Sequence, residues 1–255
     1  MPEVSAHAKA IVQAGIAAGR NIKVFAKVGN CMTASPDYLA PVTTGKYDLG
    51  QYSSLQATID YYQAVTVRED NGKKLDSFSN VSQAAGQGFT ASSPLDPIWA
   101  DPHYCQSGET PLTCEYRVTN PAISLILFGT NDVQYVDAGK FDSYMRTITQ
   151  QTIKANILPV LITFPPLPDR LDKTQQYNQI IAQVAAENDV PLVNLWKALL
   201  DKPGYGVDPQ HFTRLTTPAD GCSVCFNDTD LKSGITTENL VMLQALDTLR
   251  QQLAQ

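Results

Sequence analysis

The sequence lacks the features by which membrane-spanning and nucleic-acid-binding chains are recognised. No apolar run reaches the ~18–20 residues that a membrane-spanning helix requires. The 19 basic side chains are outnumbered by 25 acidic ones, which leaves a formal net charge of −6, and the Lys and Arg residues form no cluster. We therefore expect no transmembrane segment and no nucleic-acid partner.

Motifs for metals and nucleotides are missing as well. The three histidines are scattered, and none belongs to a His-Glu-x-x-His pattern. No Gly-x-Gly-x-x-Gly and no P-loop follows a predicted strand. We expect no cofactor and no metal.

What is present is a chain that can bury a sizeable core. Its 255 residues are 43% hydrophobic and 17% charged, a composition typical of globular proteins. The first 20 residues are rich in Ala but are interrupted by charged and polar side chains, so they do not resemble a secretion signal. No internal repeat or linker divides the chain, and we predict a single domain over 1–255.

The five cysteines are Cys31, Cys105, Cys114, Cys222 and Cys225. The last four form two local pairs in polar loops, which favours two disulfides and leaves Cys31 unpaired. Disulfides indicate an oxidising compartment, so we expect a secreted or periplasmic protein whose signal is absent from this sequence. A four-thiolate zinc site is the alternative, although eight residues separate the first pair, where two to four are usual. A redox-active Cys-x-x-Cys is disfavoured because the second pair lacks a strand-to-helix setting.

Apolar runs alternate with segments of helical spacing along most of the chain. We predict strands at 22–28, 122–128, 158–164 and 190–196, and helices at 137–155, at 172–188 and from about residue 237 onward. Apolar strands that alternate with helices are typical of a parallel sheet covered on both faces. The expected fold class is therefore α/β.

The segment 51–117 does not follow this pattern. It is weakly periodic and rich in Ser, Gly, Asp and Pro. An irregular stretch of ~65 residues is rarely an idle loop in a compact domain. We predict that it carries short strands and helices that wall a cleft.

Three short polar segments come after predicted strands. They are Gly-Asn-Cys-Met-Thr at 29–33, Gly-Thr-Asn-Asp at 129–132 and Asp-Pro-Gln-His at 208–211. Ligands bind to open parallel sheets beyond the carboxyl ends of the strands. We therefore expect the three segments to converge on one rim.

Together these segments hold the parts of an acyl-transfer site. Cys31 lies at a turn that we expect to open a helix, where the helix N-terminus and an imidazolium would stabilise a thiolate. Asp208 can orient the imidazole of His211, which leaves the other ring nitrogen free to act as a base. The side-chain amide of Asn131 can donate to an oxyanion.

Each of these residues also has a structural interpretation. A cysteine after a strand is often a small buried apolar residue. Asp-x-x-His can be a surface turn, and Gly-Thr-Asn-Asp can be a turn closed by an Asx cap. Of the other two histidines, His7 lies in the N-terminal segment, and His103 is kept only as a residue of the substrate rim.

The order of these motifs resembles that of the SGNH (GDSL-type) hydrolases, esterases and lipases on a flavodoxin-like three-layer α/β/α fold. The family's Gly-x-Asn-Asp block is matched at 129–132, and its C-terminal Asp-x-x-His is matched by Asp208 and His211. Gly88 or Gly86 falls where the family has a middle glycine. The resemblance covers about 22–250.

The resemblance implies a role for each matched residue. His211 would be the general base and Asp208 its orienting partner. Gly88, Asn131 and the backbone N–H of Cys31 would form the oxyanion hole. Hydrolysis would proceed through an acyl-enzyme.

The first motif departs from the family pattern. Gly29-Asn30-Cys31 stands where the family has Gly-Asp-Ser, so a thiol occupies the position of the nucleophile. Cysteine beside histidine is a competent nucleophile, but a misplacement of about 1 Å can cost ~100-fold in rate. We expect Asn30 to weaken the turn, since it removes an anion there. The paired change favours a natural variant over a deliberate Ser-to-Cys replacement.

Two functions follow. We expect an ester hydrolase with a Cys31–His211–Asp208 triad, acting on an acyl or acetyl ester of a small molecule or glycan. The alternative is a catalytically silent protein of the same fold that binds an ester, glycan or lipid ligand without turnover.

Overall fold

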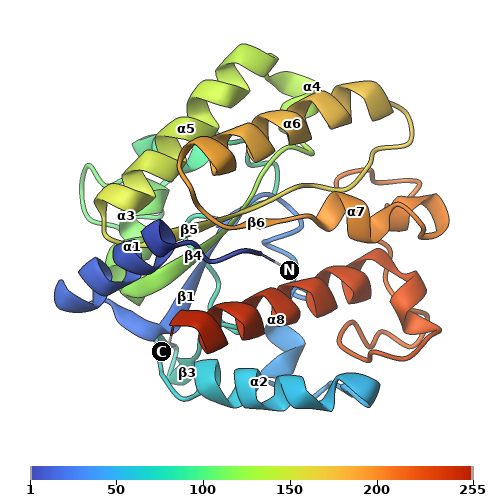
Figure 1. Cartoon of the computed structure of the whole chain (residues 1–255), viewed down its shortest axis with the longest axis horizontal. Coiled ribbons are helices and arrows are strands. Elements are labelled where there is room, and N and C mark those ends of the chain that lie inside the picture. Colours follow the sequence, from blue (N-terminus) through green and yellow to red (C-terminus); the bar gives the residue numbers. More distant parts are fainter. Residues whose placement is uncertain (1, 254–255) are drawn as a thin grey trace.

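The computed structural model describes residues 2–253, in which a parallel sheet lies between layers of helices (Figure 1). Its strands are β1 (Asn21–Gly29), β4 (Pro121–Leu127), β5 (Leu158–Ile162) and β6 (Leu192–Val193). They pair in parallel in the order β1-β4-β5-β6. The strands are buried because helices cover both faces, which explains their nearly continuous apolar sequence. The predicted three-layer α/β sandwich is confirmed.

A fifth strand position lies beside β1 but is reduced to one bridge. Gly29 forms a parallel bridge with Ala85. The N–H of Gly29 donates to the carbonyl of Ala84 (3.1 Å), and the N–H of Gly86 donates to the carbonyl of Gly29 (3.2 Å). With this segment on one side of β1 and β4 on the other, the strand order reverses at β1. Open α/β sheets bind their ligands at such a reversal.

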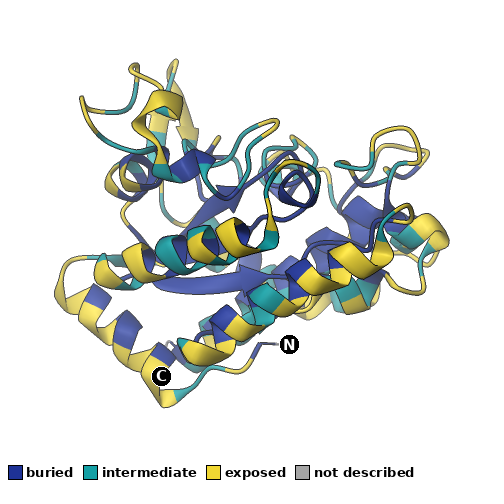
Figure 2. Cartoon of the chain, turned by 90° about the horizontal axis from the view of Figure 1, so that it is seen from above, coloured by how far each residue is buried: buried dark blue, intermediate teal, exposed yellow. Residues whose placement is uncertain are grey.

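The helices form two layers around the sheet. In chain order they are α1 (Ala6–Ala17), α2 (Gln56–Gln63), α3 (Pro111–Thr119), α4 (Asp132–Tyr135), α5 (Ala138–Lys154), α6 (Leu171–Glu187), α7 (Leu195–Leu199) and α8 (Gly234–Leu253). In Figure 1, α5 and α6 lie on one side of the sheet, and α2 and α8 lie on the other. Figure 2 shows the strands and the inward helix faces buried and the outward faces exposed. None of the described helices is long and apolar enough to cross a membrane.

Two predicted elements differ from the observed ones, and one observed helix was not predicted. The strand expected at 190–196 is only two residues long, because the side chain of Asn194 accepts from the N–H of Lys197 and starts α7. α8 begins at Gly234, three residues before the predicted start. The N-terminal α1, which we did not predict, begins where the Ser5 hydroxyl accepts from the N–H of Ala8.

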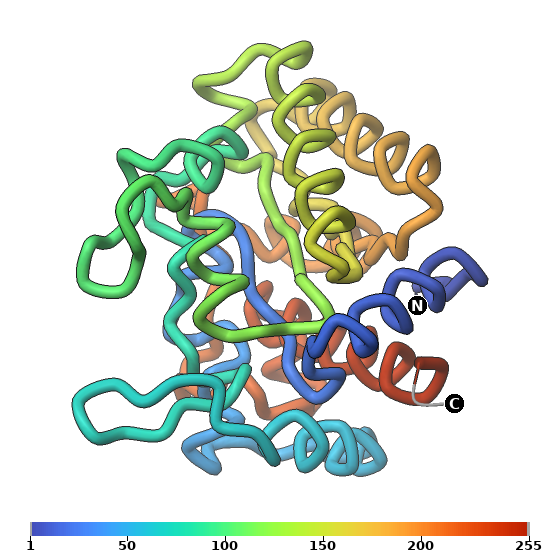
Figure 3. The backbone as a smooth tube through the Cα atoms, turned by 90° about the vertical axis from the view of Figure 1, so that its left-hand side faces the viewer, coloured from blue at the N-terminus to red at the C-terminus, as the bar shows by residue number. Residues whose placement is uncertain are grey.

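The segment 51–117 contains short elements, and Figure 3 shows it in blue-green to green, looping over one side of the molecule. Besides α2 and α3 it holds a hairpin of β2 (Arg68–Asp70) and β3 (Lys73–Leu75). Short 3-10 turns lie at Ser93–Leu95 and Pro97–Trp99. The predicted mixture of short strands and helices is present.

Candidate active site

Cys31 lies just beyond the end of β1, where the strand order reverses. The residue is buried, with 7% of its surface exposed. Residues 31–34 form a turn closed by the N–H of Ala34 on the carbonyl of Asn30 (2.9 Å). The expected helix at Cys31 is therefore wrong, and none of the helices that the structure describes begins at the thiol. Pro36 supplies a reason, since a proline keeps the preceding residue out of the helical region.

Asn30 holds this turn instead of weakening it. Its side chain is fully buried and accepts from the N–H of Met32 (3.0 Å). Its amide nitrogen donates to the Thr130 hydroxyl (2.7 Å), which ties the end of β1 to the segment after β4. An amide both accepts and donates, whereas an ionised carboxylate only accepts. Our expectation that Asn30 weakens the turn is therefore wrong.

The sulfur of Cys31 faces two of the expected oxyanion donors. The N–H of Gly88 donates to Sγ at 3.1 Å, and Nδ2 of Asn131 lies at 3.7 Å from it. The N–H of Gly86 is already bound to the carbonyl of Gly29, so of the two glycines only Gly88 faces the thiol. Gly88 has a φ of +77°, a left-handed conformation that favours glycine. Within residues 2–253, the backbone N–H of Cys31 has no hydrogen-bond partner.

The segment after β4 is fixed by the carboxylate of Asp132. This buried group accepts from the N–H of Ala91 (2.7 Å) and from the N–H of Gly129 (3.0 Å). Burial raises the pKa of Asp132 to about 6, and the two N–H groups oppose the rise. Asn131 is held by a bond from Nδ2 to the carbonyl of Phe89 (2.8 Å). Asp132 therefore fastens the segment 88–91 to the segment that carries Asn131.

Asp208 and His211 lie on an exposed turn. Nδ1 of His211 is 3.8 Å from Oδ2 of Asp208, and their side chains are 58% and 34% exposed, respectively. The N–H groups of Gln210 (2.8 Å) and His211 (3.1 Å) donate to Oδ1 of Asp208. The bond from Gln210 is the main cause that lowers the pKa of Asp208. No hydrogen bond joins His211 to Cys31 in the described part of the chain.

A cleft of about 390 Å³ joins the two halves of the site. Cys31 and Asp208 both line it, so the first and last motifs share one cavity, whereas Asn131, Gly88 and His211 are not among the residues that line it. Asp37, Gln87 and Arg214 add charged and polar groups to its walls. No sequence motif singles out these three residues, although Gln87 directly precedes Gly88 and Arg214 lies three residues after His211. From the segment 51–117, as far as the structure describes it, only Gln87 lines this cleft.

The remaining histidines lie away from the described cleft. His103 is exposed, and its ring packs edge-on against Tyr104, with centroids 4.5 Å apart. It does not line the cleft, so its place on the substrate rim is not supported. His7 lies on the exposed face of α1.

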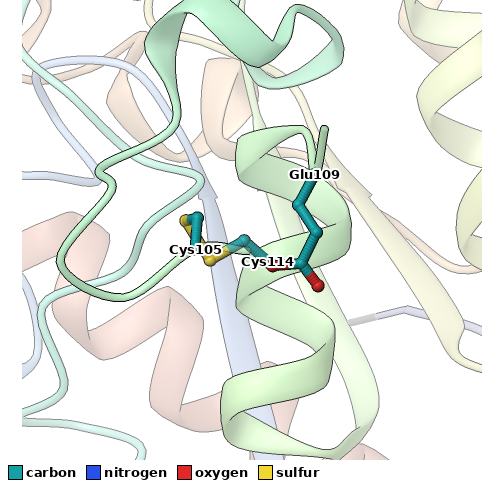
Figure 4. Close-up of side chains that lie close together, drawn as sticks. All are labelled: Cys105, Glu109 and Cys114. Atoms are coloured by element: carbon teal, nitrogen blue, oxygen red, sulfur yellow. A yellow bond between two sulfur atoms is a disulfide. The ribbon is translucent and has the colours of Figure 1, made fainter. Parts of the chain in front are cut away.

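Both expected cysteine pairs lie at disulfide distance, with Cα atoms 5.2 Å apart for Cys105–Cys114 and 5.4 Å apart for Cys222–Cys225. Figure 4 shows the first pair with the carboxylate of Glu109 beside it. These sulfurs are bonded to each other, and Glu109 pairs with Arg117 at 2.6 Å. Among the described residues, no group of potential metal ligands combines the two pairs. The alternative of a four-thiolate zinc site is therefore wrong.

Comparison with solved structures places the fold among hydrolases of esters. The lipase/acylhydrolase from Enterococcus faecalis is 17% identical, with a TM-score of 0.53, covering 89% of this chain and 95% of that one. The acetylxylan esterase Axe2 from Geobacillus stearothermophilus is 13% identical, with a TM-score of 0.54 over 87% of this chain and 93% of that one. The psychrotrophic esterase EstA from Pseudoalteromonas sp. is 12% identical, with a TM-score of 0.53 over 91% of this chain and 100% of that one. The fold is therefore that of the SGNH-type hydrolases.

The family model of the GDSL-like lipase/acylhydrolases matches residues 79–215, more than half of the chain. The chain belongs to this family, and membership supports ester hydrolysis as its general class of activity. The match includes Gly88, Asn131, Asp208 and His211, whereas Cys31 lies before it. A comparison with curated proteins finds no significant match.

Proposed function

We propose that this chain hydrolyses small acyl or acetyl esters at the cleft, with Cys31 as the nucleophile. His211 is the general base, and Asp208 orients it. The N–H of Gly88, Nδ2 of Asn131 and the N–H of Cys31 hold the oxyanion. The observation that carries the proposal is the position of the Cys31 sulfur, 3.1 Å from the N–H of Gly88 and 3.7 Å from Nδ2 of Asn131.

The chemistry proceeds in two halves. Because Nδ1 of His211 faces Asp208, Nε2 is the nitrogen available to take the thiol proton. Sulfur attacks the ester carbonyl, the carbonyl oxygen becomes an oxyanion, and His211 returns the proton to the departing alcohol. The resulting thioester is attacked by water, which loses its proton to His211. Collapse of the second intermediate releases the carboxylic acid and restores the thiol.

The observed side-chain positions define what must change before the first step. The sulfur of Cys31 occupies the hydrogen-bond donors that the substrate carbonyl needs, the N–H of Gly88 and Nδ2 of Asn131. Within the described residues it makes no hydrogen bond to the His211 ring. The mechanism requires the Cys31 sulfur to turn away from both donors and to come within hydrogen-bond reach of the imidazole. Such tightening is common, since catalytic hydrogen bonds are often long before substrate binds.

The cleft supports a substrate with a polar alcohol part. His211 must protonate the leaving oxygen, so the alcohol lies on the side of Asp208, in a cleft that is also lined by Asp37 and Arg214. Both side chains offer hydrogen bonds to hydroxyl groups, which suits an acylated glycan or a small polyol. The two disulfides favour export from the cytoplasm as part of the same proposal.

The alternative, a silent protein that binds an ester or glycan, is favoured by one observation. The thiol satisfies the oxyanion donors, and the base is exposed and not bonded to it in the described structure. A protein fixed in this arrangement would hold a ligand in the cleft without turnover.

Hydrolysis of p-nitrophenyl acetate by the wild type, Cys31→Ser and Cys31→Ala separates these functions. We expect the wild type to exceed Cys31→Ala by on the order of 10³-fold, because removal of a nucleophile leaves only residual catalysis. Thiol titration first establishes that Cys31 is reduced. Turnover by Cys31→Ser alone would favour the silent protein. Equal rates in all three proteins would show that Cys31 is neither the nucleophile nor the residue that silences the site.

A further inference from the structure

The segment that carries Gly88 lacks the strand ladder that would ordinarily fix its position. Its only bridge to the four-stranded sheet is the one between Gly29 and Ala85, with two backbone hydrogen bonds, in the described structure. A longer ladder would add a bond with every further pair of residues. Other groups must therefore hold the segment 76–88 in place.

Glu115 on α3 supplies such groups. Its carboxylate is fully buried, and it accepts from Nδ2 of Asn80 (3.0 Å) and from the N–H of Gln83 (2.8 Å). Next to Gln83, the hydroxyl of Ser82 accepts from the N–H of Ala84 (3.0 Å). The bonds of Glu115 therefore reach Gln83, two residues before Ala85 of the bridge to Gly29.

A buried cation from β1 balances this carboxylate. Nζ of Lys27 donates to the carbonyl of Phe78 (2.7 Å), and the charges of Glu115 and Asp76 act on it. Burial lowers the pKa of Lys27 to about 8 and raises the pKa of Glu115 to about 7, while each opposes the shift of the other. Lys27 lies on β1, four residues before Cys31. The network therefore joins the strand that ends at the thiol to the segment that provides Gly88.

We propose that Glu115 is a positioning residue: it takes the place of the missing ladder and holds the N–H of Gly88 against Sγ of Cys31. Its effect on rate rests on the proposed function, but its effect on the position of Gly88 does not. Glu115 itself touches neither the thiol nor the cleft among the described residues.

The test compares Glu115→Gln with Tyr116→Phe, its neighbour on α3. Tyr116 is also buried, and its hydroxyl hydrogen-bonds to Ser124 (2.9 Å) and to Thr152 (2.8 Å), away from the segment 76–88. Hydrogen exchange of peptides that span 79–91 reports the position of the segment, and kinetics with p-nitrophenyl acetate report the site. We expect Glu115→Gln to raise exchange in 79–91 at least ~10-fold over that in Tyr116→Phe. We expect kcat to fall ~10–100-fold with KM changed less than ~2-fold.

A compensating variant distinguishes positioning from general destabilisation. Glu115→Gln combined with Asn80→Asp reverses the donor and the acceptor of this pair and restores a carboxylate near Lys27. Oε1 of the new glutamine can still accept from the N–H of Gln83. We expect the double variant to recover most of the protection in 79–91 and most of kcat.

The possible outcomes separate this proposal from the proposed function. Exchange in 79–91 that is the same in Glu115→Gln and Tyr116→Phe would overturn the positioning role, whatever the activity. Faster exchange in 79–91 with an unchanged kcat would overturn it too. If the wild type hydrolyses no ester, the exchange comparison and its recovery in the double variant still decide the position of Gly88.

Discussion

The two halves of the site are built in opposite ways. Cys31, Asn30 and Asn131 form a buried half, and Gly88, itself exposed, joins it through the bond from its N–H to Sγ of Cys31. His211 lies in an exposed half, with 58% of its side chain accessible and an ion-pair distance of 3.8 Å to Asp208. The proposed oxyanion donors are therefore already oriented in the free protein, whereas the proposed base is not yet against the thiol.

This difference indicates where catalytic free energy would come from. Donors that are already oriented cost no reorganisation during the reaction, which makes electrostatic stabilisation of the transition state effective. A base on an exposed turn must be brought to the thiol by the substrate or by rotation of the Cys31 side chain. The buried half should therefore couple activity to stability, and the exposed half should not.

Replacement of one residue from each half sharpens the comparison and has the largest expected effects. His211→Ala should lower kcat/KM by up to ~10⁴-fold, because general acid–base catalysis is lost, and should leave the free energy of unfolding unchanged. Asn131→Ala should lower kcat/KM by ~10²–10³-fold and cost ~1 kcal/mol of stability, because the carbonyl of Phe89 loses its donor. Both are measured by ester kinetics and urea unfolding, with His7→Ala as a surface control. Full activity of His211→Ala would contradict the assignment of the base.

A smaller effect is expected on the pH dependence of stability, from a buried carboxyl group that takes no part in the proposed reaction. Glu238 on α8 is fully buried, and its carboxylate oxygens have no hydrogen-bond partner within residues 2–253. Burial raises its pKa to about 8. The folded protein therefore holds the Glu238 proton more tightly than the unfolded chain does. The resulting contribution to the free energy of unfolding is complete below the ordinary pKa of glutamate and is lost as pH rises through about 8.

Glu238→Gln should therefore remove a fall in stability between pH 5 and pH 8 on the order of 3 kcal/mol, with no change in kcat. Urea unfolding at several pH values measures the difference between wild type and variant. Glu69→Gln, at an exposed position of β2, is the matched control and should not alter the profile. A parallel pH dependence in wild type and Glu238→Gln would show that Glu238 is not the responsible group.

The sequence predicts the central sheet better than its edges. β1 and β4 are recognisable because both faces are buried and the apolar runs are nearly continuous. The last strand has an equally apolar run, but a cap at Asn194 converts most of it into α7. The helix predicted to begin at Cys31 is absent because the side chain of Asn30 closes a local turn at the end of β1.

The candidate residues of the site are recognisable by their order, but their geometry is not. Gly86 and Gly88 lie two residues apart in one loop, and only the bonds of Gly86 to Gly29 and of Gly88 to Cys31 show which N–H faces the thiol. The burial of Glu115 and Glu238 has no sequence signal, since a glutamate on a helix usually faces solvent. Contacts between distant segments decide both features.

Trapping an acyl-enzyme tests the central claim, that Cys31 is the nucleophile, most directly. The protein is mixed with p-nitrophenyl acetate, quenched in acid and digested, and the peptide that contains Cys31 is examined by mass spectrometry. We predict one acetyl group on this peptide as a thioester, accumulating further in His211→Ala if its acylation persists, and none in Cys31→Ala. Steady hydrolysis with no acetyl group on Cys31, and an equal rate in Cys31→Ala, would contradict the account.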